Sequence, residues 1–487
     1  MFREALKLYR ELAKENPSVY SPYVATTCNN LAILLKASSV DREKAEALYQ
    51  EALKLRRELA KENPSVYGSD VAATCNNLAV LLSKSSAGRK EAEDLYREAL
   101  KLRRELAKEN PSVYGSDVAM TCNNLANLLS KSSAGRKEAE DLYREALKLC
   151  RELAKENPSV YSPYVAITCN NLANLLSKSS ADREEAEDLY REALKLRREL
   201  AKESPPVYSP YVALTCNNLA NLLSKSSAGR KEAEDLYREA LDLYRKLANE
   251  NPSVYSPYVA MTCNNLANLL SKSSADREEA KDLYREALKL RRELARENPS
   301  VYDQYVAGTC NNLANLLSES SADRKETEDL YREALKLYRK LAKENPSVYG
   351  PNVAVTCNNL ALFLSKSSAG RKEAEDLYRE ALKLRRELAK ENPSVYSSDV
   401  AMTCNNLANL LSDSSEGRKE AEALYREALE RYRELTRQAP EVYGHWLAWV
   451  CRDLGDFLRS DGRQEEAQAL FREADGVEEP AAAGLLG

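Results

Sequence analysis

The feature that most constrains the fold is a fixed period of 47 residues, which runs along nearly the whole chain. Its clearest marker is a cysteine that returns at the same place in every period. The series is Cys28, Cys75, Cys122, Cys169, Cys216, Cys263, Cys310, Cys357, Cys404 and Cys451. Self-similarity in this range is typical of stacked repeats, in which each unit buries its apolar face against its neighbours. The sequence therefore predicts one continuous array of repeats, although a chain of 487 residues would otherwise suggest about three globular domains.

The period divides the chain into four parts. Residues 1–19 align with the second half of a unit, so we expect a truncated half-repeat that consists of a second helix only. Residues 20–442 form nine nearly identical helix-pair repeats, and residues 443–474 form a divergent repeat that caps the C-terminal end. Residues 475–487 have no helical period, which predicts a disordered tail.

Each unit carries two apolar stripes with helical spacing. Val118, Cys122, Leu125 and Leu129 are spaced 4, 3 and 4 apart, which predicts a first helix over about residues 116–130. In other units a Ser-Pro pair, such as Ser162-Pro163, predicts the N-cap and first residue of this helix.

The second helix is predicted from Gly135 to Asn157, where Pro158 prevents its continuation. In other units an Asp takes the place of Gly135, and Asp182-Arg183-Glu184-Glu185 has the spacing of a capping box. Two amphipathic helices per unit can bury their stripes only against neighbouring units. The fold class is therefore all-α, an α-solenoid of antiparallel helix pairs.

Charge and cysteine placement limit the partners and the compartment. Lys and Arg total 72 against 76 Asp and Glu, so there is no basic excess for a nucleic-acid partner. No apolar run approaches the ~20 residues that span a bilayer, and the N-terminus lacks the pattern of a secretory signal. The phased cysteines lie on the core stripe, too far apart for disulfides, which predicts buried thiols, a reducing compartment and a cytoplasmic location.

These stripes resemble the tetratricopeptide pattern, in which W-x2-L-G-x2-Y is followed by A-x3-F and a later A. The matching residues are Cys122, Leu125, Ala126, Leu129, Ala139, Tyr143 and Ala146 in one unit, and Cys451, Leu454, Gly455, Leu458, Ala467, Phe471 and Ala474 in the last. The recurring Val-Ala-x-Thr-Cys-Asn-Asn-Leu-Ala resembles the signature of kinesin-light-chain-type repeats. The resemblance implies a right-handed superhelix that binds proteins or peptides in a groove lined by the first helices. The period departs from the usual ~34 residues, mainly through a longer second helix.

The predicted groove is the stripe of each first helix that lies opposite the core. It carries a row of Asn amides, a variable apolar position and a Lys row. The Asn residues are Asn30, Asn77, Asn124, Asn127, Asn171, Asn174, Asn218, Asn221, Asn265, Asn268, Asn312, Asn315, Asn359, Asn406 and Asn409. The apolar and basic residues are Met120, Ile167, Leu214, Met261, Lys131, Lys178, Lys225 and Lys272. Amides suit an extended peptide backbone, and the variable position would read its side chains.

A structural interpretation stays open beside this one, because Asn rows can also form ladders between repeats. The last unit has Trp446 and Trp449 on the same stripe, which predicts either a packed cap or a partner pocket. The chain has one His and no Gly-rich nucleotide loop, so we expect no catalytic site, no metal site and no cofactor.

The sequence thus predicts a non-enzymatic scaffold for a protein or peptide, with neither nucleic acid nor membrane as partner. Two alternatives remain. The array could be a structural spacer that self-associates through its uncapped N-terminal half-repeat, where Phe2, Leu6 and Leu12 would lack a covering helix. It could also be the sensor-arm fragment of a larger signalling protein.

Overall fold

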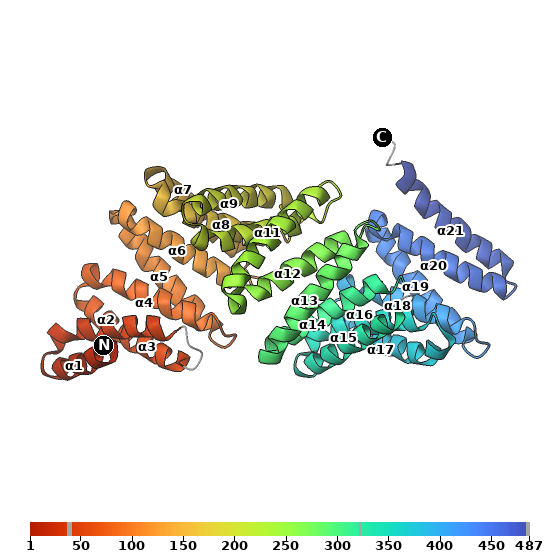
Figure 1. Cartoon of the computed structure of the whole chain (residues 1–487), viewed down its shortest axis with the longest axis horizontal. Coiled ribbons are helices and arrows are strands. Elements are labelled where there is room, and N and C mark those ends of the chain that lie inside the picture. Colours follow the sequence, from red (N-terminus) through yellow and green to blue (C-terminus); the bar gives the residue numbers. More distant parts are fainter. Residues whose placement is uncertain (37–40, 321–322, 484–487) are drawn as a thin grey trace. The chain divides into compact units, whose positions relative to one another are not determined.

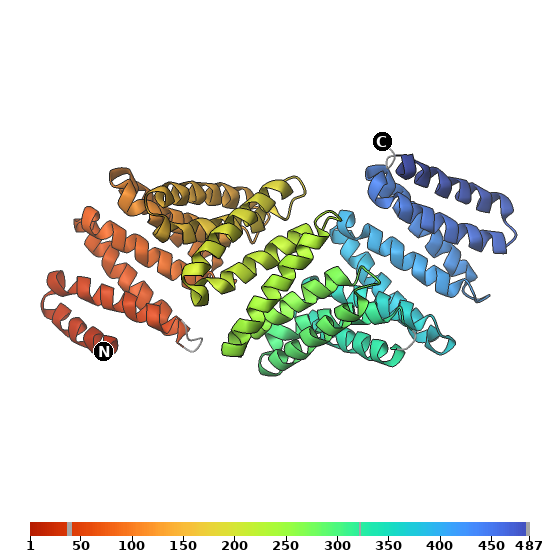
Figure 2. The ribbon, with the colours of Figure 1, turned by 45° about the horizontal axis from the view of Figure 1, so that its top comes forward.

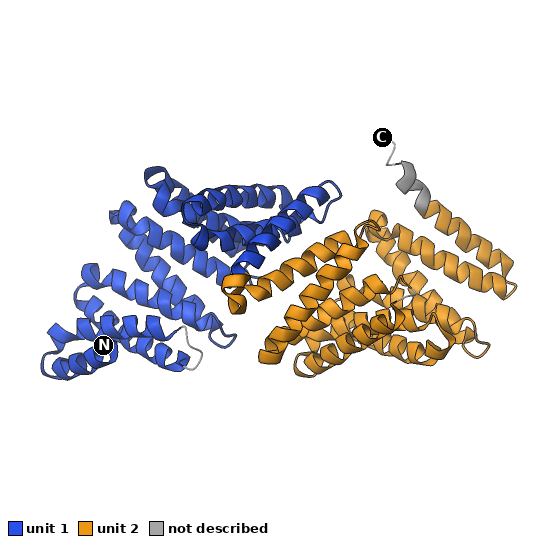
Figure 3. Cartoon of the chain, viewed as in Figure 1, with its two compact units in different colours: residues 1–247 blue, residues 248–487 orange. Residues whose placement is uncertain are grey.

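The protein is a stack of α-helices, as the sequence predicts. The structure, a computed structural model, describes residues 1–36, 41–320 and 323–483, and no β-strand occurs in these ranges. The chain divides into two compact units, residues 1–247 and 248–487, with the boundary inside one helix (Figure 3). Consecutive helices pack against each other from α1 to α10 in unit 1 and from α12 to α21 in unit 2 (Figure 1). The view in Figure 2 shows the same antiparallel pairs. The predicted α-solenoid is confirmed.

First and second helices alternate through both units. Unit 1 contains α1 (Phe2–Glu15), α2 (Pro17–Leu35), α3 (Arg42–Glu62), α4 (Pro64–Leu82), α5 (Arg89–Glu109), α6 (Pro111–Leu129), α7 (Arg136–Glu156), α8 (Pro158–Leu176), α9 (Arg183–Glu203), α10 (Pro205–Leu223) and most of α11 (Arg230–Glu250). Unit 2 continues with α12 (Pro252–Leu270), α13 (Arg277–Glu297), α14 (Pro299–Leu317), α15 (Arg324–Glu344), α16 (Pro346–Leu364), the 3-10 turn Ser368–Gly370, α17 (Arg371–Glu391), α18 (Pro393–Leu411), α19 (Arg418–Gln438), α20 (Pro440–Ser460) and α21 (Gln464–Ala483).

The connection from each second helix to the next first helix is a single residue. Asn110 has φ −136° and ψ 76°, and it ends α5 and caps α6. Its N–H donates to Leu106 O at 3.0 Å, and its carbonyl accepts from Tyr114 N at 3.1 Å. Pro111 then takes the first helical position, where its missing N–H costs no hydrogen bond.

This connection corrects two sequence predictions. The first helix begins at Pro111, five residues before the predicted Ser116, because Asn110-Pro111 forms the N-cap and first residue. Pro163 accordingly lies inside α8 and does not start it.

The second helices begin where the sequence predicts, but the capping box is wrong. Gly135 and Asp182 are the N-caps of α7 and α9. In the second helices whose N-caps are described, the N-cap side chain accepts no hydrogen bond from the first turn. Asp182 has φ −96° and ψ 11°, which is not the extended geometry that lets an N-cap side chain reach the first turn. Its carboxylate instead lies 3.7 Å from Arg136 of the preceding unit.

The core consists of the residues that the periodicity selected. Cys122, Leu125 and Ala126 of α6 and Ala139 and Tyr143 of α7 are all buried. All eleven cysteines are buried. Burial raises the pKa of the Cys122 thiol to about 12, so this group packs as a small apolar side chain at neutral pH.

Ion pairs join consecutive second helices on their exposed sides. Arg104 Nη2 lies 2.5 Å from Glu145 Oε2, and the same pair recurs one period later as Arg151 and Glu192 at 2.5 Å. The side chains of Arg104 and Glu145 are 47% and 36% exposed, so each such pair stabilises the array by at most ~1 kcal/mol. Repeated along the array, these pairs favour one register between neighbouring units.

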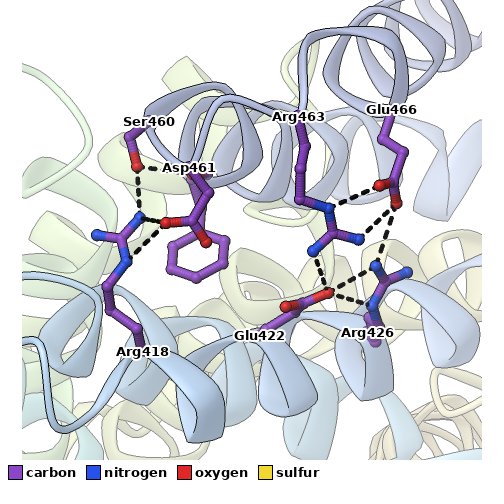
Figure 4. Close-up of polar contacts among 8 residues, drawn as sticks. Arg418, Glu422, Arg426, Ser460, Asp461, Arg463 and Glu466 are labelled. Carbon is purple, nitrogen blue, oxygen red and sulfur yellow. Dashed lines mark hydrogen bonds and ion pairs between the residues drawn. The ribbon is translucent and has the colours of Figure 1, made fainter.

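A polar network joins α19 to the last repeat. In Figure 4 Arg418 of α19 contacts Ser460 and Asp461, while Arg463 and Arg426 contact Glu422 and Glu466. Gly455 allows the close approach of the Phe471 ring, because a Cβ there would lie 2.5 Å from the ring. Helix α21 spans Gln464–Ala483 and so includes part of the segment 475–487 for which the sequence predicts a disordered tail. Residues 484–487 lie outside the described residues.

Candidate ligand-binding groove

The predicted stripe of the first helices lines a real pocket in unit 1. Its volume is about 470 Å³, and its walls come from three consecutive first helices, α4, α6 and α8. Six predicted groove residues lie in this wall: Asn124, Asn127, Lys131, Asn171, Asn174 and Lys178. Val80 of α4 and Lys84, which follows this helix, also line it, and Tyr96 and Tyr143 line it from the second helices. The pocket therefore combines amides, ammonium groups and apolar surface.

In six of the described repeats the second Asn of the pair donates a hydrogen bond to the first Asn of the preceding repeat, whereas Asn312 Nδ2 donates to Asn268 Oδ1 at 3.2 Å. Asn124 Nδ2 donates to Asn76 Oδ1 at 3.2 Å, and Asn171 Nδ2 donates to Asn123 Oδ1 at 3.1 Å. Bonds of the same kind link Asn77 to Asn29, Asn218 to Asn170, Asn359 to Asn311 and Asn406 to Asn358. The Asn rows therefore form ladders between neighbouring repeats. Each hydrogen bond of a ladder, called a rung below, fixes the orientation of an amide at the groove.

The third Asn of the motif is held by the core tyrosine. Tyr143 Oη donates to Asn127 Oδ1 at 2.6 Å, and Tyr190 Oη donates to Asn174 Oδ1 at 2.5 Å. Asn221, Asn268, Asn315 and Asn409 accept from the equivalent tyrosines. This bond uses one lone pair of the Asn127 oxygen and fixes the orientation of the amide, so that its NH2 group can donate to a ligand.

The other predicted groove positions differ in exposure. Ile167 is 38% exposed, whereas Met120, Leu214 and Met261 are half-buried. The four lysines Lys131, Lys178, Lys225 and Lys272 are exposed. Lys225 Nζ also donates to Ser177 O of the preceding unit at 3.3 Å.

A row of buried arginines below the groove was missed from the sequence. They are Arg56, Arg103, Arg197, Arg291 and Arg385 on the second helices, each buried. Arg103 Nη1 donates to the Asp117 carbonyl at 3.0 Å and to the Thr121 hydroxyl on the next first helix. The sequence did contain a signal for their burial, because a position that holds Tyr or Cys in other copies is seldom exposed. The residues at this position in the other copies are Tyr9, Cys150, Tyr244, Tyr338 and Tyr432.

The last unit gathers aromatic rings on its first helix. Trp446 stacks on Tyr432 with ring centroids 6.5 Å apart, and its ring meets the Trp449 ring edge-on at 5.7 Å. His445 lies against Trp446 at 4.8 Å. Trp446 is 36% exposed. The two tryptophans, predicted to form either a packed cap or a partner pocket, therefore form a cluster that is packed on one side and exposed on the other.

At the N-terminal end the exposure differs from the prediction in one residue. Phe2 and Leu12 are exposed, as expected, and so is Leu8. Leu6 is buried, because it packs into a cluster with Val24, Cys28 and Leu31 of α2. No described helix is long and apolar enough to cross a membrane. Across the ranges that the structure covers, no group of three metal-ligating side chains occurs.

The pattern that the repeats share is that of a known family. The model of the tetratricopeptide repeat matches residues 24–64, 71–111, 118–158, 165–206, 212–252, 259–299, 306–346, 353–393 and 400–436. The chain belongs to the tetratricopeptide repeat family. The predicted resemblance is thereby confirmed. No curated protein matches this tetratricopeptide repeat chain in sequence.

Several solved structures resemble the chain. The apo form of RapI has 13% identity, covers 85% of this chain and 99% of its own, and gives a TM-score of 0.56, which shows a common fold. BtubC from P. vanneervenii has 23% identity, coverage of 52% and 92%, and a TM-score of 0.41. The nearly identical TPR-like repeats of a putative kinesin light chain from Podosopora anserina have 16% identity, coverage of 48% and 99%, and a TM-score of 0.35.

Proposed function

We propose that this tetratricopeptide repeat protein is a non-enzymatic, cytoplasmic scaffold that binds an extended peptide, or an extended segment of a partner protein, along its first helices. The observation that carries the proposal is the unit 1 pocket, where the predicted Asn and Lys residues of consecutive first helices meet. The three lysines around it, Lys84, Lys131 and Lys178, favour a ligand with acidic character.

The hydrogen bonds within and between repeats support this proposal, because they leave different groups of the two amides available to a ligand. Asn124 uses one N–H in its rung, which leaves its Oδ1 as an acceptor for a peptide N–H. Asn127 uses its oxygen for Tyr143, which leaves two N–H donors for a peptide carbonyl. Main-chain bonds of this kind give affinity, and the variable position beside them, such as Ile167, gives specificity.

The test is a display selection of random peptides against the whole chain and against Asn127→Leu/Asn174→Leu. This double change is tolerable, because Leu362 occupies the equivalent position naturally. We expect enriched peptides to bind the variant at least about tenfold more weakly, since two bonds to the peptide are lost. An exposed Asn outside the groove, in Asn249→Leu, serves as the matched control. Equal binding by Asn127→Leu/Asn174→Leu, with unchanged circular dichroism, would contradict groove binding.

Self-association through the N-terminal half-repeat is a second candidate. The exposed Phe2, Leu8 and Leu12 of α1 favour it, because they form an apolar surface on one helix. Sedimentation velocity of the chain and of Leu8→Glu tests it. Dimers that disappear in the variant would support a structural or self-assembling role, and a monomer at all concentrations would contradict it.

A further inference from the structure

Five copies of the repeat place an arginine below the groove, and these copies fall into two classes. Arg56, Arg103 and Arg385 each lie near a carboxylate of the following first helix. The distances from Nη2 to Oδ1 are 3.6 Å to Asp70, 3.8 Å to Asp117 and 3.9 Å to Asp399. In the other two copies a tyrosine stands where the aspartate would be.

Arg197 in unit 1 is one of these two. Its side chain is buried, and Nη1 donates to the Tyr211 carbonyl at 3.1 Å, to Asn170 Oδ1 at 3.5 Å and to the Thr215 hydroxyl. The Tyr211 ring lies over the guanidinium, with 5.5 Å from Cζ to the ring centroid. Among the described residues no carboxylate lies within ion-pair distance of Arg197.

Arg291 in unit 2 repeats this arrangement. Nη1 donates to Asn264 Oδ1 at 3.2 Å, to the Tyr305 carbonyl at 3.2 Å and to the Thr309 hydroxyl. The Tyr305 ring lies 5.6 Å from Cζ, and the described part of the chain offers Arg291 no acidic partner. A buried cation without a counter-charge is costly, and burial lowers the pKa of each of the two guanidinium groups to about 10.

The aspartate copies show from which side such a cation is reached. The Asp70 side chain is 48% exposed and that of Asp117 is 36% exposed, yet both carboxylates come within 4 Å of a buried guanidinium. The guanidinium is therefore reached from the face of the first helix that carries the groove, and at Arg197 and Arg291 a tyrosine ring covers it on this face. Tyr211 and Tyr305 are themselves 45% and 46% exposed at this place.

We propose that Arg197 and Arg291 each bind a carboxylate of the peptide ligand, an Asp or Glu side chain, at the place that Asp117 occupies beside Arg103. The inference rests on the proposed groove function and adds the ligand class: a peptide with acidic residues. The chain supplies the anion itself in three copies, and the ligand supplies it in these two. The ligand carboxylate takes this place when the tyrosine ring turns aside, because a charge-assisted bond is stronger than the cation–π contact that it replaces.

The experiment uses the differences between the chain's own copies. Random 12-residue peptides are selected on the whole chain, and Kd is measured by fluorescence anisotropy for the enriched peptides and their Glu→Gln or Asp→Asn forms. The same peptides are then measured with Tyr211→Asp/Tyr305→Asp, which places an internal carboxylate beside both arginines. Tyr211→Phe/Tyr305→Phe, which keeps both rings, is the matched control. Asp117→Tyr/Asp399→Tyr removes the internal carboxylate from two further arginines.

We expect acidic residues at fixed positions of the enriched peptides. Neutralising them, or using Tyr211→Asp/Tyr305→Asp, should weaken binding at least about tenfold, and added salt should do the same in part. Tyr211→Phe/Tyr305→Phe should stay within about threefold of the original Kd, and Asp117→Tyr/Asp399→Tyr should tighten binding of acidic peptides.

Enrichment without acidic positions, or equal binding by Tyr211→Asp/Tyr305→Asp, overturns this inference. If Asn127→Leu/Asn174→Leu still abolishes that binding, the proposed groove function stands without it. No enrichment on the unmodified chain overturns both. Asp occurs naturally at this position in three copies, so the substituted chains are expected to fold, and circular dichroism checks this.

Discussion

Tyr143 donates its phenolic hydrogen to Asn127 Oδ1 at 2.6 Å, and this bond joins the aromatic core of one unit to its groove. The bond recurs wherever the Asn recurs. In the first complete unit Ile33 replaces the Asn, and the buried Tyr49 hydroxyl has no partner among the described residues. One chain therefore contains both the satisfied and the unsatisfied form of the same tyrosine.

Replacing these two tyrosines by phenylalanine should have opposite consequences. Tyr143→Phe removes a hydrogen bond and should destabilise α7 by about 1 kcal/mol, while Tyr49→Phe removes an orphaned hydroxyl and should be neutral or stabilising. Native-state hydrogen exchange of α7 and α3 measures the local free energy of opening in each case. Equal losses in both variants would contradict the proposed energetic role of the bond to Asn127.

The buried Arg197 should reduce stability. Arg197→Tyr removes a cation without a counter-charge, and the new ring can stack as Tyr9 stacks on Tyr23, at 5.4 Å and 19°. We expect a gain of about 1 kcal/mol. Arg103→Tyr should gain less, because it also leaves the Asp117 carboxylate without its cation. Thermal unfolding of both variants measures the difference, and a loss of stability in Arg197→Tyr would show that the guanidinium is adequately compensated.

Close packing in the last unit makes Gly455 sensitive to substitution. In Gly455→Ala the new Cβ would lie 2.5 Å from the Phe471 ring, so the ring or helix α21 must shift. We expect a cost of about 1–3 kcal/mol from this overpacking. In Gly476→Ala, on helix α21, the new Cβ meets nothing within 4 Å, so this change should be neutral or stabilising because Ala favours helix. Urea unfolding followed by tryptophan fluorescence reads this unit, because both tryptophans lie in it.

The buried thiols predict a loss of stability at alkaline pH. Burial raises the pKa of Cys75 and Cys216 to about 12 from an ordinary value of 9.0. A raised pKa means that the folded state holds its proton longer than the unfolded state. The stability that these protonated thiols contribute to the folded state is fully present below pH ~9. It is lost progressively as the pH rises towards 12, because the unfolded state loses its thiol protons first. Urea midpoints between pH 7 and 11 should fall above pH 9, and a thiol reagent at pH 8 should label native protein slowly and unfolded protein fast. Fast labelling of native protein would contradict this burial.

The period of the sequence predicted most of the fold, because residues at equivalent positions have the same packing environment in each repeat. Cys122, Leu125 and Ala126 were placed in the core correctly, as was the end of the second helix at Asn157. The start of the first helix was misplaced because Ser162-Pro163 and Asn157-Pro158 carry the same N-cap signal, and the local pattern does not rank them. The segment from residue 475 has no helical period in the sequence, yet the bounds of helix α21 extend to Ala483.

The candidate site was predictable only in part. The helical wheel placed Asn124, Asn127 and Lys131 on one stripe, and these residues line one pocket. The bond from Asn124 to Asn76 depends on the distance between consecutive first helices, which a repeat period does not contain. Arg197 was missed for a related reason, because whether a charged side chain is buried depends on the neighbouring unit that covers it.

The single-residue connection at Asn110 fixes the rotation of α6 relative to α5. Deleting or adding one residue there would turn the next helix by about 100° and expose its core face. Gain or loss of a whole 47-residue module restores every rung, ion pair and core contact at the new junction. The length of such an array can therefore change during evolution by copy number, and the reach of its groove would change in steps of one module.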